Sequence, residues 1–188
     1  MPVLTGRMTA KQFLDLPEDP DKTRYELVHG EVVVSPSPNL DHAIAGRNLL
    51  VQLALHVKAR SLGEIIPDTD TYFGPDDVRR PDIMFFSNAR SHFIGEQYLE
   101  GPPDLCIEIL SPSNRHVDRG DKFELYRDSG VSFYWIFDPM LRTVEAYRLS
   151  NGQYVEAGYA KDNATVRLAP FDDLEIRLAE IWRPTKSS

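Results

Sequence analysis

The chain has 188 residues, of which 41% are hydrophobic and 27% charged, and this length and composition predict one globular domain instead of a disordered chain. Lys and Arg total 21 against 29 Asp and Glu, so the formal net charge is −8. This balance excludes a strongly basic protein that coats nucleic acid, because such binding depends on clustered positive charge. The single cysteine, Cys106, excludes an intramolecular disulfide framework and a multi-cysteine metal site.

The first residues and the apolar runs of the sequence do not suggest a membrane location. Residues 1–11, MPVLTGRMTAK, contain no apolar signal-peptide core. No apolar run approaches the roughly 18 residues that a membrane span requires. We therefore expect a soluble, cytoplasmic protein.

The charge is unevenly distributed along the chain. Residues 42–60 contain three basic residues and no acidic one, whereas residues 61–78 contain five acidic residues and no Lys or Arg. An acidic protein can still hold a polyanion if its excess acid lies away from the site or is neutralised by bound cations. The net charge therefore weakens a nucleic-acid function without excluding it.

Turn and capping signals organise the N-terminal part of the sequence. Thr9 is a candidate N-cap for a short helix over residues 10–16. The alternating segments 25–28 and 31–34 predict a β-hairpin whose two-residue turn is His29-Gly30.

A long helix and two strands are predicted next. Asn39 or Asp41 caps the helix, and Leu62-Gly63 ends it. Its apolar residues recur at helical spacing and form one stripe: Ala45, Leu49, Leu50, Leu53 and Val57. Strands are expected over about residues 64–73 and 80–86.

Two apolar segments in the second half, residues 104–110 and 131–137, have the length of buried strands. Between them a helix is predicted from residues 111–114 to about Ser129. After Asp138-Pro139, strand patterns over 143–149, 154–159 and two shorter segments predict a β-meander, which either forms a homodimer face or completes the core. The element order predicts an α/β (α+β mixed) fold, with a mixed sheet and helices packed on it.

Two carboxylates stand where apolar residues are expected. Asp82 lies within PDIMFF, on the predicted strand face of Met84, and Glu108 lies within LCIEIL, on the face of Cys106. Ionised carboxylates are rarely buried unless they are paired or bound to a metal. A divalent cation between two such acids would remove both the burial cost and their repulsion, and oxygen ligands favour Mg²⁺ or Mn²⁺ over zinc.

The alternative is that each acid simply pairs with an arginine. The candidate partners are Arg79 or Arg80 for the first acid, and Arg115 or Arg119 for the second. For one acid alone this pairing is the favoured interpretation. Two such acids in flanking apolar strands favour a functional site.

Two further charged residues are candidate site residues only if Asp82 and Glu108 form a functional site. Glu26 lies in the first hairpin strand, where an exposed edge position is the simpler interpretation. Lys122 would by itself be a solvated helix charge. Beside metal-binding carboxylates, it could orient or deprotonate a water or neutralise a developing oxyanion.

Four motifs in order resemble the Uma-two family of restriction-endonuclease-like proteins, within the PD-(D/E)XK nuclease superfamily: YELVHGE, RRPDI, CIEILSPS and KFELYRDSGVSFYWIFDP. The resemblance spans about residues 8–182. It implies one restriction-endonuclease-like domain over residues 1–188, with an αβββαβ core at about 8–140 and the β-meander at about 141–182. It also implies metal-dependent hydrolysis of phosphodiester bonds in DNA.

The resemblance also assigns residues. Glu26 matches the N-terminal acid, Asp82 the acid of the P-D element, and Glu108 the second-strand acid, so these three are the predicted metal ligands. The superfamily lysine usually lies two residues after the last acid, where this chain has Leu110. Lys122 on the following helix fills that role.

Two secondary candidates complete the set. His42 matches a histidine common in the family and either reaches the phosphate or caps the long helix, the structural role being favoured. Tyr126, one turn after Lys122, either supports that lysine or packs in the core.

The sequence thus predicts a Mg²⁺- or Mn²⁺-dependent endonuclease with DNA as its partner. A non-catalytic DNA- or protein-binding module on the same fold is the alternative, and a hydrolase of small phosphate esters is a third. The expected DNA-facing surface is the stretch 42–60 with Arg79, Arg80, Arg115 and Arg119.

Overall fold

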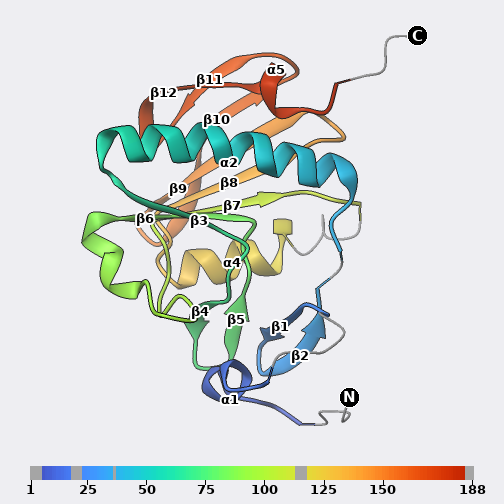
Figure 1. The fold of residues 1–188 in the computed structure, drawn as a ribbon, viewed down its shortest axis with the longest axis vertical. Helices are drawn as coiled ribbons and strands as arrows, with labels where there is room; N and C mark the ends of the chain where they lie inside the picture. Colours follow the sequence, from blue (N-terminus) through green and yellow to red (C-terminus); the bar gives the residue numbers. More distant parts are fainter. Residues whose placement is uncertain (1–5, 18–22, 36, 113–117, 185–188) are drawn as a thin grey trace.

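A mixed six-stranded sheet forms the centre of the fold in the computed structural model, which describes residues 6–17, 23–35, 37–112 and 118–184 (Figure 1). In spatial order its strands are β10 (Gln153–Lys161), β9 (Thr143–Ser150), β8 (Phe133–Asp138), β7 (Leu105–Ile109), β6 (Ile83–Ser87) and β3 (Gly63–Pro67). Neighbouring strands are antiparallel except β7 and β8, which are parallel.

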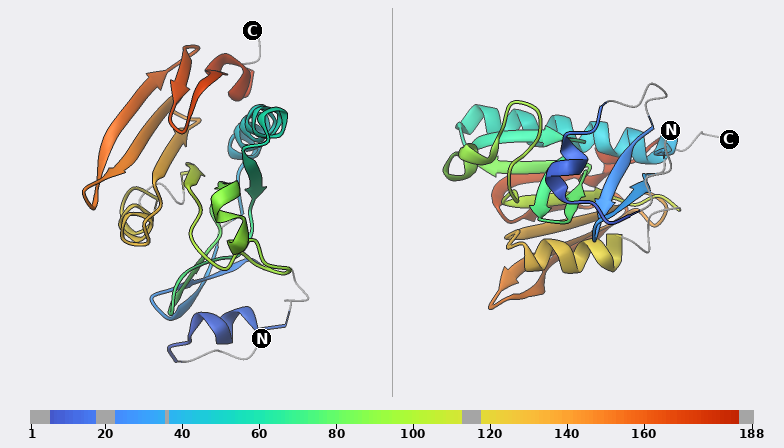
Figure 2. Two further views of the ribbon diagram at one scale, coloured as in Figure 1. Left: turned by 90° about the vertical axis from the view of Figure 1, so that its left-hand side faces the viewer. Right: turned by 90° about the horizontal axis from the view of Figure 1, so that it is seen from below.

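Helices cover both faces of this sheet, α2 (Leu40–Arg60) on one side and α4 (Asp121–Asp128) on the other (Figure 2). The predicted stripe of α2 is buried against the face of β7 that carries Ile107. Tyr126 of α4 packs on the opposite face with Cys106. The order α2–β3–β6–β7–α4–β8 is the expected αβββαβ core, so the predicted fold class is confirmed.

A second, four-stranded sheet lies below the first in Figure 1. Its order is β2 (Glu31–Val34), β1 (Tyr25–Val28), β5 (Asp77–Arg79) and β4 (Thr71–Gly74). The hairpin has its predicted bounds, and the turn residues His29 and Gly30 both have positive φ, as a primed turn requires. The short helix α1 (Ala10–Leu14), capped by Thr9, packs Phe13 against this sheet.

The meander strands β9 and β10 extend the central sheet, and the remaining chain closes over the α2 side. This last part consists of the hairpin of β11 (Thr165–Leu168) and β12 (Phe171–Arg177), and then α5 (Leu178–Ile181). A 3₁₀ helix, η1 (Asn88–Phe93), follows β6. Within the described ranges, no helix is long and apolar enough to cross a lipid bilayer.

Three sequence predictions need correction. The strand predicted over 64–73 is divided between two sheets, because Asp68 adopts a positive φ of 44° and turns the chain between β3 and β4. The strand predicted over 80–86 begins only at Ile83. The helix predicted to run to Ser129 is interrupted at Gly120, and its predicted start at residues 113 and 114 lies outside the described residues.

Gly63 is expected to be essential for seating β3 on β6. Its φ is +147°, and a Cβ at this position would overlap the carbonyl oxygen of Phe86. Gly63→Ala should therefore lower the free energy of unfolding by at least about 2 kcal/mol, measured by urea denaturation. Gly152→Ala is the control, because Gly152 also has positive φ but open space around it, and it should cost only about 1 kcal/mol. Equal losses would contradict this steric explanation.

Candidate active site

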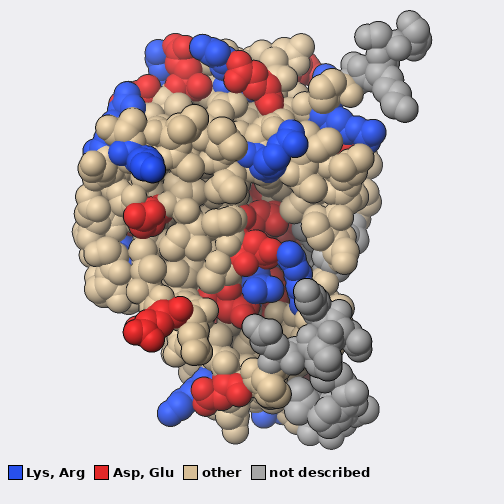
Figure 3. Space-filling model, in the orientation of Figure 1, with Lys and Arg blue, Asp and Glu red and all other residues tan. Residues whose placement is uncertain are grey.

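A cavity of about 730 Å³ lies where the four-stranded sheet meets α2 and one edge of the central sheet. Acidic and basic side chains gather in this recess (Figure 3). Five of the six residues selected from the sequence line it: Glu26, His42, Asp82, Glu108 and Lys122. The sixth, Tyr126, is buried behind the cavity wall and contacts Glu108.

Asp82 is placed by the pairing of β6 with β7. Ile83 lies opposite Ile107, which brings the residue before β6 beside the end of β7. The Asp82 Oδ2 atom accepts a hydrogen bond from the Ile109 amide at 2.7 Å and lies 3.0 Å from His42 Nε2. Asp82 thus lies immediately before β6 and is partly exposed, which corrects its predicted place within the strand.

His42 orients this carboxylate. The helix cap predicted at this point is made by the Asn39 side chain, which accepts a hydrogen bond from the His42 amide at 2.9 Å. The His42 ring is therefore free of the capping role, and its Nε2 contacts Asp82.

Glu108 is held from two sides within β7. The Tyr126 hydroxyl donates to Oε1 at 2.6 Å, and Lys122 Nζ lies 2.9 Å from Oε2. Burial raises the pKa of Glu108 well above its usual value; the Lys122 ammonium opposes this shift, and the carboxylates of Asp118 and Asp82 add to it. Tyr126 therefore supports the acid and not, as considered from the sequence, the lysine.

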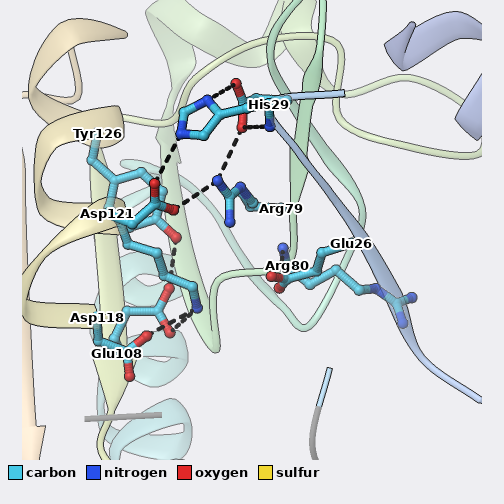
Figure 4. Close-up of polar contacts among 10 residues, drawn as sticks. Glu26, His29, Arg79, Arg80, Glu108, Asp118, Asp121 and Tyr126 are labelled. Carbon is cyan, nitrogen blue, oxygen red and sulfur yellow. Dashed lines mark hydrogen bonds and ion pairs between the residues drawn. The ribbon is translucent and has the colours of Figure 1, made fainter. Parts of the chain in front are cut away.

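Asp118 is the site residue that the sequence reasoning missed. It is fully buried, and its Oδ1 lies 3.1 Å from Lys122 Nζ (Figure 4). Neither carboxylate oxygen has a hydrogen bond of good geometry to a described residue, and burial raises the pKa of Asp118 to about 6. The available signal was its position four residues before Lys122, the spacing of an ion pair on one helix face.

Lys122 is buried between these two carboxylates, so the interpretation as a solvated helix charge is wrong. Burial lowers its pKa, but the surrounding carboxylates, chiefly Glu108 and Asp118, outweigh burial and raise the pKa well above the usual value. The side chain is consequently a cation at neutral pH.

Glu26 reaches the cavity from the other sheet. It is buried, and β1 lies between β2 and β5, so the interpretation as an exposed edge residue is also wrong. Its Oε1 accepts a hydrogen bond from the Arg80 amide at 3.1 Å. The Arg80 side chain instead pairs with Asp70, at 2.9 Å.

A buried arginine joins the two parts of the site. Arg79 Nη2 lies 3.0 Å from Asp77 Oδ1 and 2.7 Å from Asp121 Oδ2, and His29 Nε2 lies 3.0 Å from Asp121 Oδ1 (Figure 4). This Arg79 cluster connects β5 and the hairpin turn to the first residue of α4. It thereby holds the sheet that carries Glu26 against the helix that carries the lysine.

The arginine pairings considered from the sequence are wrong for the described residues. Arg79 is buried in its own cluster, and Arg119 forms a double hydrogen bond with Glu145 of β9. Arg115 lies outside the described residues. Of the expected DNA-facing surface, Arg47 remains exposed at the cavity.

The donor chemistry of the cavity suits a hard divalent cation, since the polar groups at its floor are mainly carboxylate oxygens. In the described parts of the chain, however, no three His, Cys, Asp or Glu side chains are arranged to hold a metal ion. The charge between Glu108 and Asp118 is the Lys122 ammonium. Binding a metal there would require these side chains to rearrange.

Comparison with known proteins agrees with the motifs. The sequence model of the Uma2 family, described as "Putative restriction endonuclease", matches residues 10–179. The uncharacterized protein sll1609 of Synechocystis sp. is 23% identical over 168 residues, which cover 88% of this chain and 94% of that protein.

A solved structure shares the fold. It is the crystal structure of "a putative nuclease belonging to DUF820" from Anabaena variabilis, with a TM-score of 0.75 and 23% sequence identity. The match covers 93% of this chain and 97% of that one. At this identity the likeness establishes the fold.

The Arg79 cluster should contribute strongly to stability. Arg79→Met leaves Asp77 and Asp121 without their guanidinium partner, and loss of one partner from a buried ion pair costs about 3 kcal/mol or more. Urea denaturation should show this loss. Arg167→Met is the control, because Arg167 pairs with Glu175 in solvent and should change the unfolding free energy by less than about 1 kcal/mol. Similar values for the two variants would argue against the role given to Arg79.

Proposed function

This chain belongs to the Uma2 family of restriction-endonuclease-like proteins, and we propose that it is a metal-dependent endonuclease that hydrolyses phosphodiester bonds in DNA. The observation that carries the proposal is the floor of the cavity, where Glu108 and Asp118 share the Lys122 ammonium. A structural ion pair needs one carboxylate for one ammonium. The surplus of buried acid points to a second cation.

Asp82, Glu108 and Glu26 would hold this cation, which is Mg²⁺ or Mn²⁺, and Asp118 is a further candidate ligand. When bound, such an ion stabilises negative charge on the scissile phosphate and lowers the pKa of a coordinated water. The elevated pKa of Glu108, to which neighbouring carboxylates contribute, supports this assignment because a cation would relieve the same repulsion.

The residues of the chain have separate tasks in this proposal. Lys122 serves as a charged donor toward the phosphate and not as a base, because its pKa is raised and the ammonium keeps its proton. His42 fixes the orientation of Asp82, and Tyr126 fixes that of Glu108. These two are positioning residues.

Removal of either acid should abolish activity. Glu108→Gln and Asp82→Asn keep the side-chain shape but remove the charge, and each should lower Mg²⁺-dependent DNA cleavage at least about 100-fold. Glu175→Gln is the control, because Glu175 lies in an exposed ion pair on β12. Cleavage is followed on a gel with Mg²⁺, Mn²⁺ or EDTA, and folding is checked by thermal unfolding. Undiminished cleavage by either acid variant would refute the assignment.

Mn²⁺ binding and cleavage by the wild-type protein separate the alternatives. A protein that binds no Mn²⁺ and cleaves nothing would be the non-catalytic module, which the lack of a preformed three-ligand cluster in the described residues favours. Activity on small phosphate esters without activity on DNA would indicate the third function.

Metal binding should weaken in acid. A carboxylate must lose its proton to bind a metal, and the pKa of Asp118 is raised to about 6 by burial, so protonation competes below that pH. We expect Mn²⁺ affinity, measured by calorimetry, to fall about fivefold between pH 6 and pH 5. In Asp118→Asn the affinity should be lower at pH 7 and its change near pH 6 smaller. If the wild-type Mn²⁺ affinity does not change between pH 5 and pH 8, Asp118 is not a ligand.

A further inference from the structure

Three of the candidate groups lie below the protein surface, whereas Asp82 is partly exposed. The side chains of Glu108 and Lys122 are 1% and 8% exposed, and Asp118 is fully buried. An enzyme could reach a phosphate on the outside of a rigid DNA double helix with side chains that protrude from its surface, or with a shallow groove. Here the phosphate has to enter the cavity.

The cavity is too small for a double helix. Its volume of about 730 Å³ falls among pockets of roughly 300–1,000 Å³ that enclose a single small ligand, which corresponds to about one nucleotide. The major groove of B-DNA alone is about 12 Å wide, so the body of a duplex stays outside. An unpaired strand can therefore bring a phosphodiester to the floor while the body of a duplex stays outside.

The walls suit an unpaired base. Val33 and Val34 of β2 are 37% and 63% exposed at the rim, and Leu50 and Ile83 continue the apolar lining. Enzymes that act on an extruded nucleotide hold its base between apolar or aromatic side chains. A base that remains paired cannot present its faces to such walls.

The net charge of the protein agrees with a contact to DNA that covers only a few nucleotides. A protein that follows a duplex along its backbone needs many basic groups, whereas this chain has a net charge of −8. Arg47 at the cavity is exposed, and its guanidinium contacts only the neutral Asn48 amide among the described residues, so its charge is available to a flanking phosphate.

We propose that the substrate is single-stranded DNA, including unpaired stretches within a duplex, and that its backbone enters the cavity over about one nucleotide. This inference rests on the proposed endonuclease function and adds the form of the DNA. It also assigns the exposed β2 valines as the surface that receives the unpaired base.

Cleavage of matched substrates tests the form of the DNA. One labelled strand is offered alone, in a blunt duplex, and in a duplex with a central mismatched bubble. Because unpairing costs a few kcal/mol, the single strand and the bubble should be cut at least about tenfold faster than the duplex. Equal or faster cutting of the duplex would overturn the inference and leave the nuclease function standing. Absence of cutting on all three would count against the proposed function, and binding then decides the inference.

Binding is measured by fluorescence anisotropy with Ca²⁺ in place of Mg²⁺, on the same labelled strand and duplex. Val34→Glu puts a negative charge at the rim and should weaken single-strand binding at least about fivefold. Val155→Glu is the matched control, because Val155 is also an exposed strand valine but lies on β10, outside the cavity lining; binding should stay within about twofold of wild type. Equal affinity for strand and duplex, or no effect of Val34→Glu, would overturn the inference.

Discussion

The buried ammonium of Lys122 is the interaction on which the rest of the site depends. It lies 2.9 Å from Glu108 and 3.1 Å from Asp118, two carboxylates almost wholly removed from water. Without a cation between them these acids could not both stay ionised, because burial and mutual repulsion each favour the protonated form. The same contact fixes α4 against β7, so the charge that stabilises the acids also sets the position of the helix. One lysine therefore serves the fold and the proposed chemistry together.

The two sheets meet at the cavity, and each contributes acidic side chains to it. In the central sheet, antiparallel pairing of β6 with β7 brings Asp82 to the same edge as Glu108. In the smaller sheet, the hairpin presents Glu26 from the opposite wall. The Arg79 cluster holds that wall against the start of α4. The cavity thus lies between two separately paired sheets.

Sequence reasoning succeeded where the signal is local. The Thr9 cap, the His29-Gly30 turn and the apolar strand β7 follow from neighbouring residues, and all have nearly the predicted bounds. It failed where one backbone conformation decides the path. Asp68 turns the chain out of the central sheet and so divides a segment that was predicted as one strand. The burial of Lys122 was also missed, because a lysine on a short helix has the same sequence pattern whether solvent or a carboxylate lies beside it.

By itself the sequence determined the αβββαβ order of the core, the family through its four motifs, and five residues that line one cavity. These depend on hydrophobic period, turn chemistry and motif spacing, which are properties of short segments. Only the tertiary structure decided that Asp118 lies beside Lys122, that Arg79 is buried between Asp77 and Asp121, and that the lysine is enclosed. The reason is physical: whether a charge is paired, buried or free depends on groups brought near it from distant parts of the chain, and that proximity exists only after the sheets and helices have packed.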